Sequence, residues 1–486
     1  LAEFGLAGLL PGKSVQRGHA KKIGGLPVFL VEKGCARPAN RWGVGAIALG
    51  ILACACMPGW AAQLPEHISD YPAEEDRYPM EVENPFERAV NDRFLAINET
   101  GIEPFASYWG TYLANPVGGQ EQSSSWMQLL IFGAEFQLDQ LIGWEGGSVM
   151  LSATDAAGSN LSLKIGNLFT ASQAYVMNTF ALYNVYYKQR FANDALEFRV
   201  GRMSAGQLFA SLPVMGLPVN SAVNGNPTSL FTNAPFTSTA VATWAAYARV
   251  KPTEESYVQA GIFQASPRLG KPAYHGTDFS IRSGDGTLML MELGWLPGSA
   301  EAVERQPDGK TFAKAAVEPA GAQLPGVYTF GAYFSNYTFA KFSGGTEHNA
   351  YGFYAQAQQM VWRSAANPDH NVTLWGGVTY SPQTEIALLP VMGFGGVVWQ
   401  GAIPGRDEDR VLMSFYTGGF SGDYARDKAD SGGGWATAET VLEWSYIVQL
   451  TENLQFQPDI QYVFQPGGLS GIPNALVIGF QVGMEF

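Results

Sequence analysis

The sequence of 486 residues has few cysteines, few histidines and few long apolar runs. All three cysteines lie before residue 63, at Cys35, Cys54 and Cys56, so the remaining chain has no disulfide framework. Histidines beyond that point lack the spacing of a metal pair, and we expect no metal and no cofactor. The net charge of −14 argues against binding to nucleic acid.

Only the segment Trp42–Trp60 approaches the length of a membrane-spanning helix. Basic residues precede it, at Lys33, Arg37 and Arg41, and the small residues Ala61 and Ala62 follow it. This order predicts a secretory signal peptide, with residues 1–40 as an over-extended start, so residues 1–62 are set apart from the fold. A lipid anchor at Cys54 is the alternative, because Ile51–Cys54 weakly resembles a lipobox.

Residues 63–100 form an acidic, proline-containing arm. One short helix is predicted near Pro85–Ala96, because Pro85 and Glu87 suit a first helical turn. The arm belongs either in the lumen or at the periplasmic mouth, and the sequence leaves both open.

From Gly101 onward the chain alternates between strand patterns and turns. The stretch Asn474–Phe486 shows the pattern best: Leu476, Ile478 and Phe480 share one parity with a terminal Phe486, and small or polar residues such as Gln481 and Glu485 take the other. A strand facing lipid can use such a phenylalanine at the membrane interface. A soluble β-sandwich predicts the same alternation, so other features must decide.

Sixteen strands are predicted, an even number typical of a single-chain outer-membrane barrel. They are Ile102–Asn115, Trp126–Asp139, Ser148–Asp155, Leu182–Arg190, Ala195–Arg202, Ala242–Val250, Ser256–Ala265, Leu288–Trp295, Val327–Phe339, Tyr351–Arg363, Val372–Tyr380, Phe394–Ala402, Arg410–Phe420, Glu439–Leu450, Leu454–Phe464 and Ala475–Phe486. Connections after even-numbered strands are mostly short, and those after odd-numbered strands are long. Leu296–Gly326 is an exception, either an insertion or an unrecognised hairpin. With the predicted signal peptide, this favours an all-β, antiparallel, up-and-down transmembrane β-barrel over residues 101–486, with long outer loops.

Several short stretches resemble the carbohydrate-selective porin (OprB) family. They are Tyr108–Gly110 with Ala114–Gly119, Gly143–Gly146, Val200–Arg202 with Gly206–Phe209, Tyr257–Gln264, and Gly401–Arg406 with Asp409. The resemblance implies a sixteen-stranded barrel in the outer membrane of a Gram-negative bacterium. It further implies inward-folded loops and passage of glucose and other sugars.

A sugar channel needs a narrow place where polar side chains replace the water around the sugar. The connection Met203–Val241 is the longest internal one, and its prolines and glycines let it fold back compactly. We take it as the constriction candidate, with an extracellular excursion as the alternative.

Substrate-binding candidates line the pore by strand parity. Glu197 and Arg199 face the lumen by alternation, whereas Arg202 matches the family's Gly-Arg position but faces outward unless Gly201 marks a bulge. Trp109 is taken as the lumenal member of the pair that it forms with Tyr108. Further lumenal candidates are Asn184, Lys188, Arg190 and Arg249. All of these charges could instead only solvate a wide pore wall.

The sequence therefore predicts a porin that lets small neutral sugars diffuse passively into the periplasm, in contact with outer-membrane lipid. A general porin without sugar preference is the alternative within the channel class. No catalytic residues are expected. A hydrolase at one rim is the alternative from another class, tested by Ser343 and His348, which share one loop. Assembly into a homo-oligomer is left open.

Overall fold

The computed structural model of the protein describes residues 84–223, 225–298 and 323–486. The predicted signal peptide, residues 63–83 of the acidic arm and most of the long link at 296–326 lie outside these ranges. Within them, no helix combines the length and the apolar character needed to cross a bilayer.

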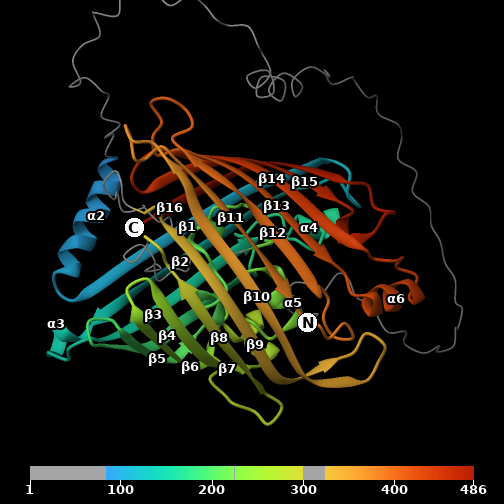
Figure 1. Ribbon diagram of the computed structural model, residues 1–486, viewed down its shortest axis with the longest axis horizontal. Helices are drawn as coiled ribbons and strands as arrows, with labels where there is room; N and C mark the ends of the chain where they lie inside the picture. Colours follow the sequence, from blue (N-terminus) through green and yellow to red (C-terminus); the bar gives the residue numbers. More distant parts are fainter. Residues whose placement is uncertain (1–83, 224, 299–322) are drawn as a thin grey trace, which may run out of the picture. The chain divides into compact units, whose positions relative to one another are not determined.

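The described chain folds into a closed barrel in which each strand pairs with its sequence neighbours and β1 pairs with β16 (Figure 1). All pairs are antiparallel. The strands are β1 (Ile102–Val117), β2 (Ser124–Gln137), β3 (Gly147–Gly158), β4 (Thr179–Phe191), β5 (Leu196–Met203), β6 (Thr243–Thr253), β7 (Ser256–Ala265), β8 (Gly286–Trp295), β9 (Gly326–Ala340), β10 (Thr346–Arg363), β11 (Asn371–Tyr380), β12 (Val391–Gln400), β13 (Arg410–Gly419), β14 (Ala438–Gln449), β15 (Leu454–Phe464) and β16 (Ala475–Glu485). The predicted sixteen-stranded barrel is thus confirmed.

Alternation of side chains sets the two faces of the wall. In β16, Ile478 is 38% exposed on the outer face, whereas Gln481 is 3% exposed and accepts a hydrogen bond from Thr111 inside. Period-two patterns predicted the strand positions well because every strand separates an apolar outside from a more polar inside. The main differences are at strand ends: β10 begins at Thr346, five residues early, because it continues to pair with the end of β9.

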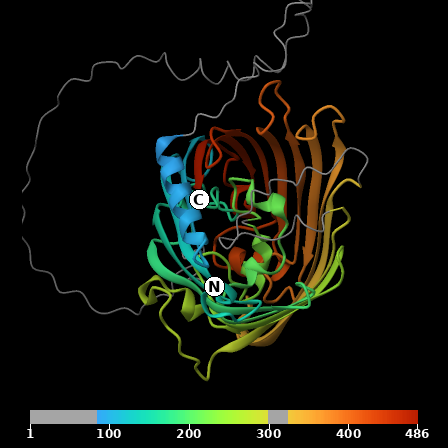
Figure 2. The same cartoon turned by 90° about the vertical axis from the view of Figure 1, so that its left-hand side faces the viewer.

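Two kinds of connection mark the two rims. The described links after even-numbered strands are short turns, and those after β3, β5, β7, β11 and β13 are long. In bacterial outer-membrane barrels the short turns face the periplasm. We define the inward segment as residues 204–242, between β5 and β6, because it folds into the barrel (Figure 2).

Short helices occupy the connections and one precedes the barrel. They are α2 (Pro85–Asn98), α3 (Leu138–Ile142), α4 (Ser162–Ile165), α5 (Thr228–Asn233) and α6 (Gly422–Asp430), with 3₁₀ turns η2 (Ala205–Gln207), η3 (Pro213–Gly216), η4 (Pro267–Gly270), η5 (Pro272–Tyr274) and η6 (Pro466–Gly468). Helix α2 confirms the predicted helix: Pro85 begins it, and Asn84 caps it by accepting a hydrogen bond from Phe86 N at 3.0 Å.

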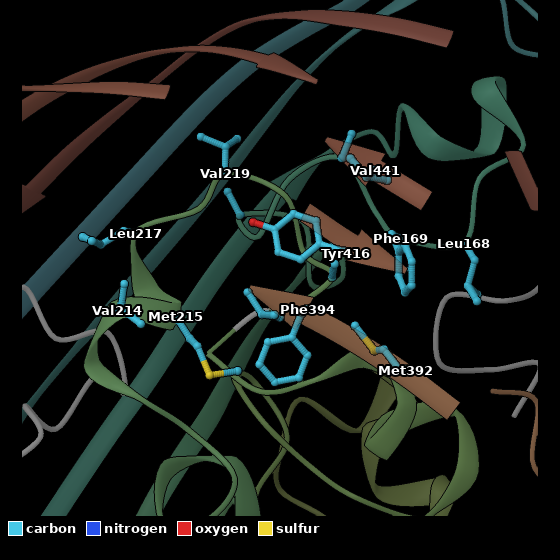
Figure 3. Packing of buried hydrophobic residues seen from close by; sticks show 14 of the residues in the cluster. Leu168, Phe169, Val214, Met215, Leu217, Val219, Met392, Phe394, Tyr416 and Val441 are labelled. Carbon is cyan, nitrogen blue, oxygen red and sulfur yellow. The ribbon is translucent and has the colours of Figure 1, made fainter. Parts of the chain in front are cut away.

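The inward segment packs against the inner wall through two apolar clusters, one of which is drawn in Figure 3. In that cluster, Met215 and Val219 of the segment are buried with Tyr416 of β13. In the other, Phe209 packs against Tyr247 of β6, with ring centres 5.9 Å apart. Burying this apolar surface stabilises the folded-in position by about 25 cal/mol per Å². The segment therefore narrows the barrel interior, which is not an open cylinder.

Candidate channel constriction

Strands β2 to β6 place charged side chains next to one another on the inner wall. Antiparallel register sets Lys188 opposite Arg199, and Glu197 opposite both Arg190 and Arg249. Cβ atoms of such directly opposed residues are about 4.5–5.5 Å apart. We call this group the lumenal ladder; its members are Glu135, Lys188, Arg190, Glu197, Arg199 and Arg249.

Glu197 is the centre of the ladder and is only 1% exposed. Its Oε1 accepts from Arg199 Nε at 2.8 Å, and its Oε2 lies 3.3 Å from Arg249 Nη2 and 3.6 Å from Arg190 Nε. One buried carboxylate therefore positions three guanidinium groups. Without it, these cations would repel one another on a wall of low dielectric.

A second ion pair continues the ladder toward β2. Lys188 Nζ lies 2.5 Å from Glu135 Oε1, and both side chains are nearly buried. Ser148 Oγ donates to the same carboxylate oxygen. Both members are satisfied by partners, so this part of the wall is rigid rather than a set of free charges.

Arg199 is also held by aromatic rings. Its guanidinium carbon lies 5.5 Å from the ring centre of Tyr186 and 5.6 Å from that of Tyr247, and Nη1 donates to the Tyr186 hydroxyl at 3.3 Å. Cation–π contacts of this kind add stabilisation where water is excluded. Arg199 is therefore fixed in orientation by three inward-facing neighbours: Glu197, Tyr186 and Tyr247.

Exposure within the ladder is uneven. The side chains of Arg190, Arg199 and Arg249 are 29%, 18% and 16% exposed, whereas Glu197 is nearly inaccessible. The guanidinium groups therefore form the accessible part of the ladder, and the carboxylate is covered. This surface presents fixed hydrogen-bond donors in planar, forked geometry.

Trp109 and Asn184, the other inward candidates, lie outside the ladder. Trp109 faces inward, is 1% exposed and donates from Nε1 to Ser107 Oγ at 2.8 Å, with its ring over Gly483. A Cβ at Gly483 would lie 2.3 Å from that ring, so only glycine fits there. Asn184 is fully buried and donates from Nδ2 to Ser152 Oγ at 3.0 Å. Burial of both side chains suits them to packing the wall.

Arg202 faces the outside of the barrel and does not line the pore. Pairing runs unbroken across Gly201, so no bulge alters the parity, and Arg202 lies opposite the outer-face Trp244. Its Nη1 donates to the carbonyl of Asp278 at 2.6 Å, and Nη2 to that of Ala242 at 2.7 Å. Its placement by analogy with the family's Gly-Arg position is corrected accordingly; alternation alone gave the right face.

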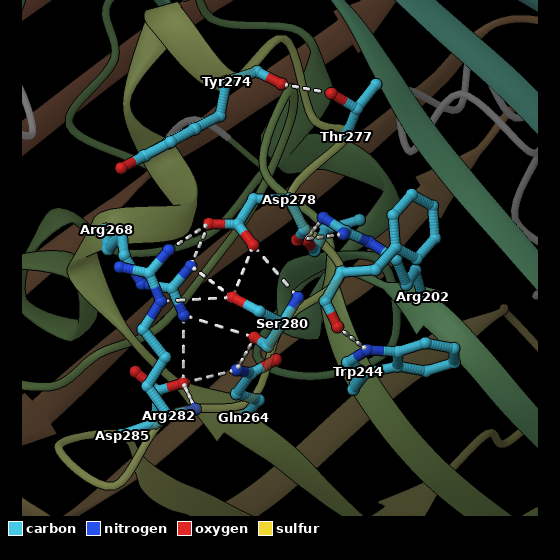
Figure 4. A network of polar contacts seen from close by, with 12 residues as sticks. Arg202, Trp244, Gln264, Arg268, Tyr274, Thr277, Asp278, Ser280, Arg282 and Asp285 are labelled. Atoms are coloured by element: carbon cyan, nitrogen blue, oxygen red, sulfur yellow. Dashed lines mark hydrogen bonds and ion pairs between the residues drawn. The ribbon is translucent and has the colours of Figure 1, made fainter.

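The connection at 266–285, between β7 and β8, covers Arg202 (Figure 4). Phe279 lies over the guanidinium of Arg202, 4.5 Å from the ring centre. Arg268 bridges Asp278 and Asp285, and Ser280 bonds to Asp278. We call Arg202, Arg268, Asp278, Ser280, Arg282 and Asp285 the outer-face network.

This same connection completes the barrel wall. Strand β5 ends at Met203, so the start of β4 extends past it. There Leu182 N donates to the carbonyl of His275 at 3.0 Å, and His275 Nδ1 lies 2.8 Å from the carbonyl of Phe180. The connection after β7 therefore satisfies main-chain groups that β5 leaves unpaired.

Buried carboxylates on β8 and β14 hold the inward segment. Glu443 of β14 accepts from the main-chain N–H of Val219 at 2.6 Å and of Asn220 at 3.0 Å, and Tyr416 donates to it. Glu292 of β8 accepts from the N–H of Ala210 at 2.9 Å. Met203–Val241 was expected either to fold inward or to reach outward, and these contacts place it inside.

Glu439 does the same for the connection after β3. It accepts from the N–H groups of Leu168 and Phe169, each at 2.7 Å, and from that of Gly467 at 2.6 Å. Neither Glu439 nor Glu443 was among the candidates from the sequence, although both lie on the polar parity of β14. A carboxylate pointing into a barrel without a basic partner in register is the signal that could have found them.

The rim pair Ser343 and His348 lies at the end of β9 and β10. His348 Nδ1 is 3.0 Å from Thr338 Oγ1 on the neighbouring strand, and Glu347 beside it pairs with Lys341 at 2.6 Å. These contacts give His348 and Glu347 structural partners on the hairpin.

Comparisons with known proteins agree with this geometry. The model of the family described as "Carbohydrate-selective porin, OprB family" matches residues 121–486. Porin B of Pseudomonas aeruginosa is 23% identical over 427 residues, covering 80% of this chain and 88% of that protein. A putative porin, QuiX, of Acinetobacter baylyi is 22% identical, covering 80% and 90%.

Among solved structures, OprB of Pseudomonas putida at high pH is similar with a TM-score of 0.71 at 21% identity, covering 82% of this chain and 97% of that one. This likeness shows the fold. The family match spans most of the chain, from the β1–β2 connection to the end of β16. The chain thus belongs to the OprB family of carbohydrate-selective porins and is an outer-membrane sugar porin.

Proposed function

We propose that this porin lets small neutral sugars such as glucose diffuse passively to the periplasm, and that the lumenal ladder selects them. The observation that carries this proposal is the cluster of three guanidinium groups around the buried Glu197. Guanidinium N–H groups can donate to sugar hydroxyls in place of water.

Neutral sugars suit this surface because its four cations are largely balanced by the carboxylates of Glu135, Asp194 and Glu197. A guanidinium bound to a carboxylate still has donors to spare, so it binds a hydroxyl without a full ionic attraction. Binding stays weak, as transport requires. Of the inward candidates we keep Arg190, Arg199 and Arg249 as the residues that face the pore, with Glu197 and Lys188 positioning them and with Asn184 and Trp109 as supports of the wall.

A general porin without sugar preference is the alternative. Support for selection comes from the inward segment, which narrows the interior: Glu443 of β14 holds it, and its Phe209 packs against Tyr247 of β6. Since Tyr247 also contacts Arg199, the segment reaches the ladder, and a molecule in the narrowed interior passes close to it.

Liposome swelling with glucose, gluconate and glucosamine, solutes of similar size and different charge, tests the proposal. We expect glucose to enter fastest in the parent protein. The double variant Arg199→Gln/Arg249→Gln should lower the glucose rate relative to that of the other solutes by roughly tenfold, because each of the two lost hydrogen bonds to a hydroxyl is worth about 0.5–1.5 kcal/mol net and about 1.4 kcal/mol is a factor of ten.

The control variant is Arg426→Gln, which removes an equal charge from an exposed side chain of α6; its rates should match the parent. Entry of gluconate or glucosamine into parent vesicles as fast as glucose would contradict selection. An unchanged ratio in the double variant would contradict the role of the ladder.

A further inference from the structure

Helix α2 lies on the rim with the short connections, beside β1 and the end of β16 (Figure 2). Phe86 and Phe94 both meet Phe486 edge to face, with ring centres 6.2 and 6.3 Å apart. Asn91 Nδ2 donates to Asn453 Oδ1 in the β14–β15 turn at 2.9 Å. Aromatic and polar contacts together fix the helix to this rim.

Phe486 belongs to the membrane-facing side of the wall. It continues the outward parity of β16, whose Ile478 is exposed, and its main chain pairs with Ala106 of β1 at 2.8 and 3.0 Å. Tyr112, opposite Phe480, is 40% exposed on that same face. The side of α2 that touches Phe486 is therefore the side nearest to lipid.

Four of the apolar residues of α2 lie on this side, whereas Leu95 lies on the opposite flank. Phe86, Val90, Phe94 and Ile97 follow one another at intervals of four, four and three residues, which places them on one face of a helix. Phe86 is 59% exposed and Ile97 39% exposed, so the protein covers only part of this face. Glu87, by contrast, is 3% exposed against the barrel.

We propose that α2 is an interfacial helix that binds the lipid surface at the periplasmic side of the outer membrane. Phe86, Val90 and Ile97 would enter the boundary between headgroups and acyl chains, where amphipathic helices insert by roughly 5–10 Å. Their apolar face is continuous, through Phe486, with the outer face of the barrel. Aromatic residues at this level are typical of membrane interfaces.

Charge does not select the lipid. The helix carries Glu87, Asp92, Arg88 and Arg93, two residues of each sign, so anionic headgroups gain little over neutral ones. Burial of apolar surface is then the main contribution to binding. A soluble periplasmic protein is the alternative partner for this face. Vesicles that contain only the purified porin lack any such protein, so a contact measured in them is a contact with lipid.

Site-directed spin labelling tests the lipid contact. In a chain with Cys35, Cys54 and Cys56 replaced by serine, Ile97→Cys and Leu95→Cys are labelled separately with a nitroxide and reconstituted into phosphatidylcholine vesicles. Leu95 is the matched control, because it is 62% exposed on the opposite flank of the same helix. Collision of each label with oxygen, which partitions into lipid, is compared with collision with a water-soluble nickel chelate.

We expect oxygen to dominate at residue 97 and the nickel chelate at residue 95, so the logarithm of the collision ratio changes sign between them. Adding phosphatidylglycerol should leave both values unchanged. Dominance of the nickel chelate at both residues would overturn the proposal, whether the helix faces water or leaves the rim. A contact at residue 97 that appears only with anionic lipid would overturn the apolar mechanism.

Discussion

Strand β5 carries two arginines, Arg199 and Arg202, that are three residues apart and have different roles. Arg199 points into the barrel, where Glu197 and two tyrosine rings hold it. Arg202 points outward, where two main-chain carbonyls and Phe279 hold it beneath the β7–β8 connection. The first leaves N–H groups toward the interior, and the second is 2% exposed and closes the wall.

The difference shows that partner type separates a pore surface from a structural clamp. A carboxylate balances the charge of Arg199 and leaves other donors for a passing molecule. Carbonyl acceptors use the donors of Arg202 to fix a connection that spans the strand edge of β4. Substitutions at Arg199 should therefore alter sugar transport, and substitutions at Arg202 should alter the order of the β7–β8 connection.

Removing Glu197, the centre of the ladder, should cause the largest loss of unfolding free energy. In Glu197→Ala, three guanidinium groups lose their buried counter-ion, and unpairing a buried charge costs about 3–5 kcal/mol. Urea-dependent tryptophan fluorescence in vesicles would measure the loss of unfolding free energy. The control Glu347→Ala removes a carboxylate whose ion pair is 30% exposed on both sides, and it should cost less than about 1 kcal/mol. Equal losses of unfolding free energy in Glu197→Ala and Glu347→Ala would contradict the central role of Glu197 in the ladder.

Arg202→Ala should have a smaller and local effect. The β7–β8 connection loses the charged hydrogen bond at Asp278 and the inward segment loses the one at Ala242, each worth about 1.5–3 kcal/mol, while the ladder keeps its contacts. Hydrogen exchange should accelerate at the Leu182 amide, which donates to His275, and the ratio of glucose to gluconate entry should stay unchanged. A shifted entry ratio with unchanged exchange would show that Arg202 serves the pore.

Lowering the pH should have the smallest of the three effects, a partial loss of contacts in the outer-face network. Hydrogen bonds from the Ser280 hydroxyl and N–H, and the guanidinium of Arg268, hold the pKa of Asp278 well below its ordinary value of 3.8. Because the folded pKa is depressed, this stabilisation is complete at neutral pH and declines as the pH falls below about 4.

Exchange at 266–285, corrected for intrinsic rates, should therefore be faster at pH 3 than at pH 6. Asp278→Asn should remove most of this dependence. If exchange accelerates equally at pH 3 in the parent and in Asp278→Asn, the pH dependence arises from titratable groups other than Asp278.

The wall could be predicted almost entirely from the sequence. Alternation is a local property, and each strand of this barrel carries it because lipid lies outside and polar side chains lie inside. Tyr257 to Gln264 shows this well: the strand Ser256–Ala265 begins and ends as predicted.

Positions of the long connections could be predicted only in part. Whether Met203–Val241 enters the barrel depends on Glu292 and Glu443, which bind its main-chain N–H groups. The N–H groups belong to the main chain and leave no residue pattern, so the sequence marks only the carboxylates, as inward charges without a basic partner in register. Alternation of side chains placed Arg199 inside and Arg202 outside. The expectation that Arg202 lines the pore came from the family's Gly-Arg motif.

Single-channel current in a planar bilayer tests the central claim, that Arg199 and not Arg202 meets the sugar. Glucose should cause concentration-dependent current noise in the parent and in Arg202→Gln, and this noise should disappear in Arg199→Gln. Noise that persists in Arg199→Gln and disappears in Arg202→Gln would contradict the account.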